Sequence, residues 1–275
     1  MTVLELLERT TKYFADHEIA SPRLTIELML AEVLKKTRMQ LYLEFDKEIP
    51  EAVLDQLRPL VKRRADGEPL EYVLGVTTFA GHRIAVTPDV LIPRPETEIL
   101  LQEAIKRIDP KGAPVLDVGT GSGILPIALA KKFPELEIIA VDISPAALAV
   151  AQKNAGDVGK IRFLESDLMA NPALPQQFQM IVANLPYIPT GALDTLQREV
   201  RREPRLALDG GADGLDLVRK LITQSVGRTR CLLLELGDGQ AGETKTLCLQ
   251  AGYALIGILP DFTQRERILV AEKAS

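Results

Sequence analysis

The sequence predicts an α/β fold, in which a mostly parallel β-sheet carries helices and is preceded by a small helical domain. From residue 114 onward, short apolar runs alternate with helical segments, which is the pattern of consecutive βαβ units. Seven such runs are expected to form strands: 114–118, 137–141, 161–164, 180–183, 231–235, 254–259 and 268–271. The first 72 residues instead show apolar residues at helical spacing and no strand-like alternation. With 275 residues, 46% of them hydrophobic, the chain can build two cores of unequal size.

Residues 1–72 are expected to form a bundle of four helices. Ser21-Pro22 provides an N-cap and a first-turn proline for the second helix. The buried face of that helix is predicted from apolar residues at helical spacing: Leu24, Leu28, Ala31 and Leu34. Shorter apolar patterns predict two more helices, around 39–45 and 50–67.

A β-hairpin linker is predicted over residues 73–88, between the bundle and a larger domain at 89–275. The runs 77–79 and 84–86 are strand-like, and Gly81-His82 is expected to form the turn between them. The larger domain then opens with Pro93–Glu98, whose acids and prolines are typical of helix initiation.

The first strand of the larger domain leads into a glycine turn that opens a helix. The turn consists of Gly119, Thr120, Gly121, Ser122 and Gly123. Glycine lets the backbone approach a ligand closely and adopt positive φ, so this is expected to be the first βα unit of a Rossmann-like sheet. Its Gly-x-Gly-x-Gly spacing departs from the Gly-x-Gly-x-x-Gly dinucleotide fingerprint.

Acidic residues end the next two predicted strands. Asp142 follows the run 137–141, and its carboxylate can accept hydrogen bonds from both ribose hydroxyls of a nucleoside. Asp167 follows the run 161–164 and could accept an adenine amino group, with Leu168 packing on the ring. The sequence therefore predicts a nucleoside site at this edge of the sheet.

Asn184-Leu185-Pro186-Tyr187 follows the strand-like run 180–183. A planar amide or exocyclic amine nitrogen is a poor nucleophile because its lone pair is delocalised. The Asn184 side-chain carbonyl and the Leu185 backbone carbonyl can accept its two N–H bonds and draw it toward a tetrahedral shape. Tyr187 can lie against the flat face of the acceptor. Glycine turn, ribose acid, adenine acid and this motif fall at four successive strand ends, the order expected of an S-adenosylmethionine (SAM) methyltransferase.

Composition limits the alternatives. Two cysteines and two histidines do not support a disulfide framework, a zinc site or a histidine-based triad. A net charge of −5 and the absence of tryptophan weigh against a protein that grips nucleic acid through phosphates and stacking. No apolar stretch reaches the length of a membrane span, and the N-terminus lacks a signal pattern. A cytoplasmic protein without metal, membrane or direct nucleic-acid binding is expected.

The chain resembles the protein-(glutamine-N5) methyltransferases of peptide chain release factors, the PrmC/HemK family, over nearly its whole length. Four segments carry the resemblance: TPDVLIPRPETE (Thr87–Glu98), LDVGTGSG (Leu116–Gly123), AVDISPAAL (Ala140–Leu148) and EVRREPRLALDGGADGLD (Glu199–Asp216). The resemblance implies a Rossmann-like class I SAM methyltransferase domain. It also implies methylation of the glutamine in the Gly-Gly-Gln motif of release factors, with S-adenosyl-L-homocysteine as product and a helical domain that helps to hold the protein substrate.

The resemblance also assigns residues. It places Gly119–Gly123 around the methionine part of SAM, Asp142 at the ribose, Asp167 and Leu168 at the adenine, and Asn184–Tyr187 at the substrate glutamine. The family motif is Asn-Pro-Pro-Tyr, and here its second position is Leu185. Leucine supplies the same backbone carbonyl, although the loop loses the rigidity of proline.

Two other functions stay open at this point. One is methylation of an exocyclic amine on RNA or DNA, because Asn-Leu-Pro-Tyr also resembles the motif of ribosomal RNA adenine dimethyltransferases. The other is a SAM-binding regulator without turnover, although cofactor binding alone requires neither Asn184 nor Tyr187.

Overall fold

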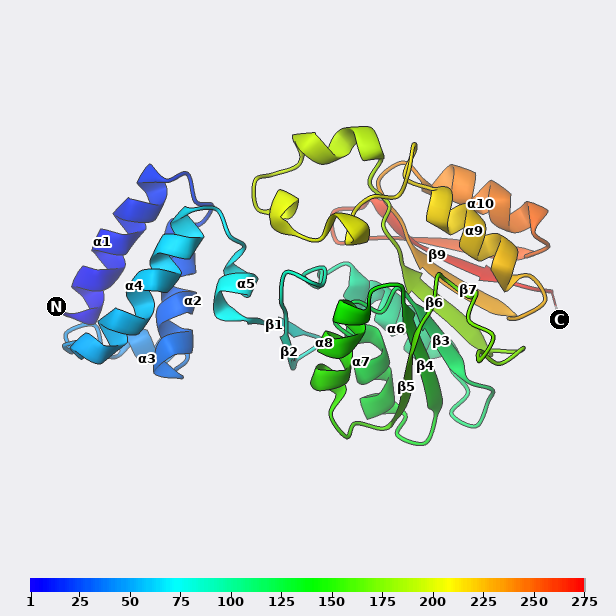
Figure 1. Cartoon of the computed structure of the whole chain (residues 1–275), viewed down its shortest axis with the longest axis horizontal. Coiled ribbons are helices and arrows are strands. Elements are labelled where there is room, and N and C mark those ends of the chain that lie inside the picture. The colour runs from blue at the N-terminus through cyan, green and yellow to red at the C-terminus, as the bar shows by residue number, and fades with distance from the viewer. Residues whose placement is uncertain (275) are drawn as a thin grey trace. The chain divides into compact units, whose positions relative to one another are not determined.

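The computed structural model describes residues 1–274, which divide into two compact units. The first contains Met1–Val76 together with Gln197–Arg202, and the second contains Thr77–Leu196 together with residues 203–274. Both are shown in Figure 1. No helix in residues 1–274 is long and apolar enough to cross a membrane.

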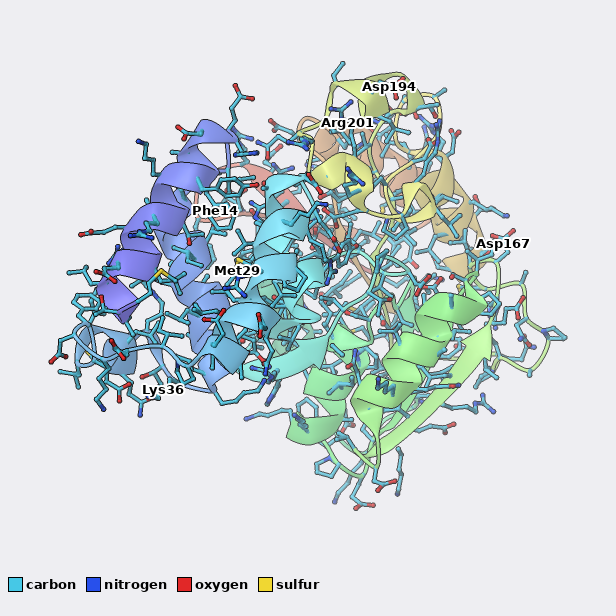
Figure 2. The ribbon with its side chains drawn as sticks, turned by 60° about the vertical axis from the view of Figure 1, so that its left-hand side comes forward. Phe14, Met29, Lys36, Asp167, Asp194 and Arg201 are labelled. Carbon is cyan, nitrogen blue, oxygen red and sulfur yellow. The ribbon has the colours of Figure 1, made fainter. Side chains whose placement is uncertain are left out.

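The first unit is a helical bundle. Its helices are α1 (Val3–Asp16), α2 (Pro22–Leu34), α3 (Arg38–Tyr42), α4 (Glu51–Ala65) and α5 (Leu70–Leu74). Thr2 and Glu5 form a complete capping box that begins α1. Phe14 of α1 and Met29 of α2 are fully buried in its core (Figure 2).

The remote segment Gln197–Arg202 joins this unit through arginine contacts. The buried Arg64 guanidinium donates to Glu199 Oε1 at 2.6 Å, and Arg202 donates to the carbonyl of Asp66 at 3.2 Å. Sequence spacing carries no information about such a pairing across more than a hundred residues.

The predicted buried face of α2 is wrong at Leu24, whereas Ala31 is buried as predicted and Leu34 packs partly buried against the core. Leu24 is 39% exposed, whereas Ile26, Met29 and Leu30 are fully buried. The reason is that α2 packs against α1, α3, α4 and α5 and is apolar on several sides, so spacing alone could not identify one face.

The predicted hairpin begins later than expected. Residues 70–74 form helix α5, which ends at Gly75 in the left-handed conformation (φ 72°). Strands β1 (Val76–Phe79) and β2 (His82–Ala85) follow. The turn lies at Ala80-Gly81, so His82 is the first residue of β2 and lies outside the turn.

The second unit is built on a seven-stranded sheet, which confirms the predicted fold class. Its strands are β3 (Val115–Val118), β4 (Glu137–Asp142), β5 (Lys160–Glu165), β6 (Met180–Asn184), β7 (Cys231–Glu235), β8 (Leu255–Pro260) and β9 (Glu266–Glu272). Their order is β5-β4-β3-β6-β7-β9-β8. The first five in this order are parallel, and β9 runs antiparallel to both of its neighbours.

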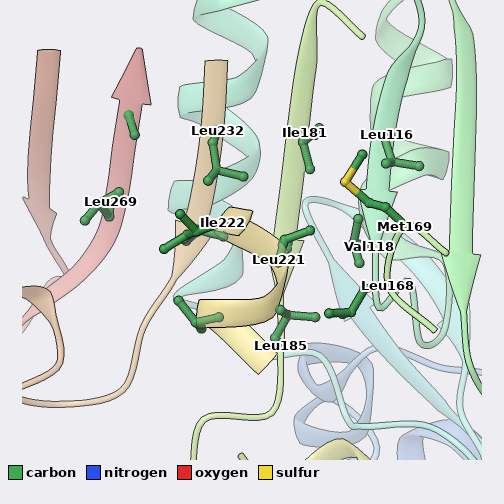
Figure 3. Packing of buried hydrophobic residues seen from close by; sticks show 14 of the residues in the cluster. Leu116, Val118, Leu168, Met169, Ile181, Leu185, Leu221, Ile222, Leu232 and Leu269 are labelled. Atoms are coloured by element: carbon green, nitrogen blue, oxygen red, sulfur yellow. The ribbon is translucent and has the colours of Figure 1, made fainter. Parts of the chain in front are cut away.

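Two hydrophobic clusters, one on each face, hold helices against the sheet. One cluster joins α6 (Thr97–Arg107) and α7 (Ile124–Lys132) to the strands, and α8 (Pro145–Ala155) packs beside α7. The other joins α9 (Asp216–Ser225) and α10 (Ala241–Gln250) to the opposite face. Figure 3 shows Leu221 and Ile222 of α9 beside Ile181 and Leu232 of the sheet.

The strand order places a topological switch point at β3. The chain leaves β3 for β4 and β5 on one side, and later returns to β6 and β7 on the other. In open parallel sheets a ligand crevice forms at the carboxyl ends of the strands at such a point. Gly119, Asp142 and Asn184 all lie at this edge.

Candidate active site

A cavity of about 320 Å³ opens at the carboxyl ends of β3, β4, β5 and β6. The loops after these strands line it, together with segments 88–94 and 204–207. Its size lies at the lower end of the range of about 300–1,000 Å³ typical of small-molecule sites. The predicted site residues that line it are Gly119, Thr120, Gly121, Ser122, Asp142, Asp167, Leu168, Asn184, Leu185 and Pro186. Gly123 lies directly behind them as the N-cap of α7.

Asp142 links the glycine turn to the loop after β4. Its two carboxylate oxygens accept backbone hydrogen bonds from Gly121 and Ser144, each at 2.9 Å. Burial raises the pKa of Asp142, and the bonds from Ser144 and Gly121 oppose that rise. Positions 119 and 121 favour glycine, because their backbone has positive φ of 76° and 54°, which other residues adopt at a cost.

The loop after β5 places Leu168 in the cavity wall in a strained conformation. Leu168 is buried and has φ 51°, which is uncommon for a non-glycine residue. The neighbouring Asp167 carboxylate pairs with Lys220 Nζ at 2.5 Å, and both side chains are about half exposed. An exposed pair of this kind contributes little stability, so the carboxylate is available for exchange with a ligand.

Leu185 points into the protein core. Its side chain is buried in the cluster that also contains Leu168 and Leu221 (Figure 3). A Cβ at Gly119 would lie 3.2 Å from Leu185 Cδ2, so the glycine turn packs directly on this leucine.

The Asn184 side chain belongs to a buried chain of polar groups. Its Nδ2 donates to Thr97 Oγ1 at 3.1 Å, and the Thr97 hydroxyl donates to Glu235 Oε2 at 2.7 Å. Burial raises the pKa of Glu235 to about 7, and its bond with Thr97 opposes this. Thr97 also lines the cavity. Of the motif Asn184–Tyr187, the first three residues line the cavity and Tyr187 does not; its half-buried ring lies beside Gly237.

A glycine-rich segment, residues 209–214, fixes the loop that contains Tyr187. The Gly210 N–H donates to the Ile188 carbonyl at 2.8 Å, and Gln240 Nε2 donates to the Tyr187 carbonyl at 2.9 Å. A Cβ at Gly214 would lie 2.2 Å from the Tyr187 carbonyl oxygen. Only glycine permits this approach, and Gly214 also has φ 83°.

Glu203 connects the two loops that form the outer wall of the cavity. The buried carboxylate accepts a hydrogen bond from the Ile92 backbone at 3.0 Å and pairs with Arg94. Segments 88–94 and 204–207 are therefore held to each other by one side chain.

Asp117 is a buried carboxylate that the sequence analysis missed. It is 1% exposed within β3, and neither of its oxygens has a hydrogen-bond partner. The Thr120 hydroxyl beside the cavity is also buried and unpartnered. Burial raises the pKa of Asp117 to about 7, the nearby Thr120 hydroxyl opposes that rise, and the charge of Asp142 adds to it. A charged residue inside an otherwise apolar strand was the signal that could have identified it.

Thr97 and Glu235 were also missed. Thr97 was hidden in a segment that resembled ordinary helix initiation, and Glu235 was interpreted only as the end of an apolar strand. Among the described residues, no group of three or more His, Cys, Asp or Glu side chains is placed to hold a metal ion.

Comparison with known proteins identifies the family. Residues 5–75 match the PrmC N-terminal domain, and residues 115–204 match a methyltransferase domain. The release factor glutamine methyltransferase of Geobacter sulfurreducens is 42% identical, covering 92% of this chain and 90% of that protein. This chain belongs to the release factor glutamine methyltransferase family. The Moorella thermoacetica relative is 39% identical, with 98% of both chains covered.

A solved structure shows the same fold at much lower identity. The hMettl16 catalytic domain, in complex with an RNA hairpin, aligns with a TM-score of 0.58 and 16% identity, covering 80% of this chain and 81% of that one. The predicted SAM-methyltransferase fold and enzymatic class are therefore confirmed for this member of the release factor glutamine methyltransferases.

Gly214→Ala is expected to disorder the loop after β6 and to lower methyl transfer strongly. The added Cβ meets the Tyr187 carbonyl, and overpacking of this kind costs about 1–3 kcal/mol. The matched control is Gly242→Ala on α10, where no atom lies within 4 Å of the added Cβ. Equal thermal stability and equal activity of the two variants would contradict the role of Gly214.

Asp117→Asn is expected to stabilise the ligand-free protein at pH 8. The folded pKa lies above the unfolded one, so the charge destabilises the folded state increasingly from about pH 4 to pH 7. Removing that charge relieves up to about 4 kcal/mol at pH 8, and the unpartnered amide offsets about 1–3 kcal/mol of this. Urea denaturation should show a gain of about 1–3 kcal/mol at pH 8.

At pH 4 the carboxyl group is neutral in the folded state and the cost of the unpartnered amide remains, so Asp117→Asn should instead lower the stability by about 0.5–2.5 kcal/mol. Glu137→Gln, at an exposed position on β4, is the control for loss of a carboxylate. A stability difference that is the same at both pH values would contradict the proposed burial of an ionisable Asp117.

Proposed function

We propose that this chain transfers the methyl group of SAM to the side-chain amide nitrogen of the glutamine in the Gly-Gly-Gln motif of peptide chain release factors. The observation that carries the proposal is that Asn184, Leu185 and Pro186 line the same cavity as the glycine turn and Asp142. One cavity thus combines groups suited to SAM with groups suited to an amide acceptor.

The cavity fits SAM chemically. Gly119, Thr120, Gly121, Ser122 and Gly123 would surround the methionine part, where positive φ at the glycines brings backbone close to the ligand. The unpartnered Asp117 oxygens and Thr120 hydroxyl provide buried polar groups that a ligand could satisfy. When bound, SAM supplies a methyl group on a sulfonium, which is a good leaving group, and S-adenosyl-L-homocysteine is the product.

The two nucleoside-binding roles are assigned by position. Asp142, fixed by two backbone N–H groups, would accept from the ribose hydroxyls. Asp167 would accept from the adenine amino group by exchanging its exposed pairing with Lys220. Leu168, held in the wall by its strained backbone, would pack on the adenine ring.

The acceptor roles belong to Asn184–Tyr187. Asn184 Oδ1 and the Leu185 carbonyl would each accept one N–H of the substrate amide, and thereby orient the nitrogen and stabilise the positive charge that develops on it. Pro186 fixes the loop through its restricted φ, and Tyr187, the residue that follows the cavity wall, would lie against the flat face of the amide. The methylated nitrogen is acidic and loses its proton to water, so the mechanism requires neither a metal nor a histidine base.

Release factor is the proposed protein partner, and the helical bundle is proposed to hold it. The match of residues 5–75 to the PrmC N-terminal domain supports a role shared within the family. The acidic balance of the chain supports recognition of protein without direct nucleic-acid contact. The similarity to an RNA-binding methyltransferase shows the fold alone and does not favour RNA as substrate.

Mass spectrometry of release factor after incubation with enzyme and SAM tests the proposed function. A gain of one methyl group on the glutamine of the Gly-Gly-Gln motif is expected. Release factor with that glutamine changed to alanine should gain none, and neither should an RNA substrate. Methylation of RNA, or of release factor at another residue, would contradict the proposal.

Two substitutions are expected to separate turnover from cofactor binding. Asn184→Ala should raise the activation free energy of methyl transfer by roughly 2.7–4 kcal/mol and leave SAM affinity nearly unchanged.

Asp142→Ala should weaken SAM binding by roughly 1.5–3 kcal/mol, because hydrogen bonds to a charged group are lost. Calorimetry and single-turnover kinetics measure the two effects. Normal turnover in the first variant, or normal affinity in the second, would show that the role of that residue is wrongly assigned.

A further inference from the structure

We propose that Thr97 and Glu235 are positioning residues that fix which end of the Asn184 amide faces the substrate. The inference rests on the proposed role of Asn184 as the acceptor for the substrate amide. Nothing in the motif Asn184–Tyr187 itself determines the rotation of that side chain.

The orientation matters because an asparagine amide presents two different ends. Its oxygen accepts hydrogen bonds, and its nitrogen donates them. A substrate amide nitrogen carries N–H groups and needs an acceptor. With Oδ1 toward the cavity Asn184 can bind that nitrogen, whereas with Nδ2 toward the cavity two donors would meet.

The hydrogen-bond chain permits one orientation. Thr97 has a single hydroxyl hydrogen, and the 2.7 Å bond directs it to the Glu235 carboxylate. The Thr97 oxygen is then left as an acceptor, and it receives Asn184 Nδ2 at 3.1 Å. When the Glu235 carboxyl group is ionised it can only accept, and it then sets the direction of both bonds and turns Oδ1 away from Thr97.

The fold places the three groups together from separate elements. Asn184 and Glu235 are register partners at the ends of the parallel strands β6 and β7. Thr97 is the first residue of α6, and its N–H donates to the Arg94 carbonyl at 3.1 Å. Thr97 and Glu235 are 1% and 2% exposed, so water does not compete for these bonds.

Glu235 is a poor choice for stability alone. Among residues 1–274 it forms no salt bridge, and the side chains that stabilise its charge by hydrogen bonding are Thr97 and, to a smaller extent, Asn184. A buried carboxylate with so few partners destabilises a fold. Because Glu235 lies beside Asn184, its carboxylate can orient the Thr97 hydroxyl and the Asn184 amide, which a leucine at position 235 could not do.

The test compares Thr97→Val, Thr97→Ser and Glu235→Gln with the wild-type enzyme. Valine keeps the shape of threonine and removes the hydroxyl, and serine keeps the hydroxyl. Glutamine at position 235 can donate to Thr97, which frees the Thr97 hydrogen to point at Asn184 and favours the flipped amide. Thr246→Val on α10, whose hydroxyl bonds only the Gly242 carbonyl on the exposed face, is the control.

Thr97→Val and Glu235→Gln are each expected to lower kcat for release factor on the order of tenfold, the effect of one lost hydrogen bond. SAM affinity should be unchanged, Thr97→Ser should restore most of kcat, and Thr246→Val should behave as wild type. A purely structural role would instead change thermal stability and SAM affinity together. If Glu235→Gln fails to fold, Thr97→Val and Thr97→Ser still decide the question.

Asn184→Ala, measured in parallel, separates the two levels of the account. If it is inactive while Thr97→Val and Glu235→Gln retain wild-type kcat, the positioning role is wrong and the proposed function stands. If Asn184→Ala is itself fully active, the proposed role of Asn184 is wrong, and the positioning role is wrong with it.

Discussion

The parallel pairing of β3 with both β4 and β6 is the constraint on which the site depends. Parallel strands end at one edge of the sheet, so the loops that follow them must meet there. The chain crosses from one side of β3 to the other at this point, which leaves a crevice that no crossover helix fills. The glycine turn, Asp142 and Asn184 are brought together by this topology, although Gly119 and Asn184 are 65 positions apart in the sequence.

The same edge carries polar groups that are unfavourable for the fold by themselves. Asp117 and Glu235 are nearly inaccessible carboxylates in central strands, and burial raises the pKa of each to about 7. Both destabilise the folded state as pH rises through the range from about 4 to 7, since the folded protein binds more protons there than the unfolded chain. The backbone is also strained here at Leu168, a non-glycine residue with φ 51°. Such features persist where a bound ligand or an oriented side chain makes use of them.

The elements that could be predicted from the sequence are those that depend on neighbouring residues alone. Strand, glycine turn and helix could be predicted at 114–130 because apolar runs and glycines act over a few residues. The buried face of α2 could be predicted only in part, because a helix surrounded by other helices is apolar on several sides. Thr97 resembled a helix start, and only the pairing of β6 with β7 shows that it bridges Asn184 and Glu235. The assignment of Gln197–Arg202 to the helical unit likewise depends on contacts such as that between Arg64 and Glu199, which are remote in sequence.

The central claim is that one cavity orients both the methyl donor and the substrate amide. A crystal structure of the enzyme with S-adenosyl-L-homocysteine and a peptide containing Gly-Gly-Gln tests it most directly. The account predicts the ribose at Asp142 and the glutamine side-chain nitrogen between Asn184 Oδ1 and the Leu185 carbonyl, with Asn184 Nδ2 still on Thr97. A glutamine bound elsewhere, or an Asn184 amide rotated with its nitrogen toward the peptide, would contradict it.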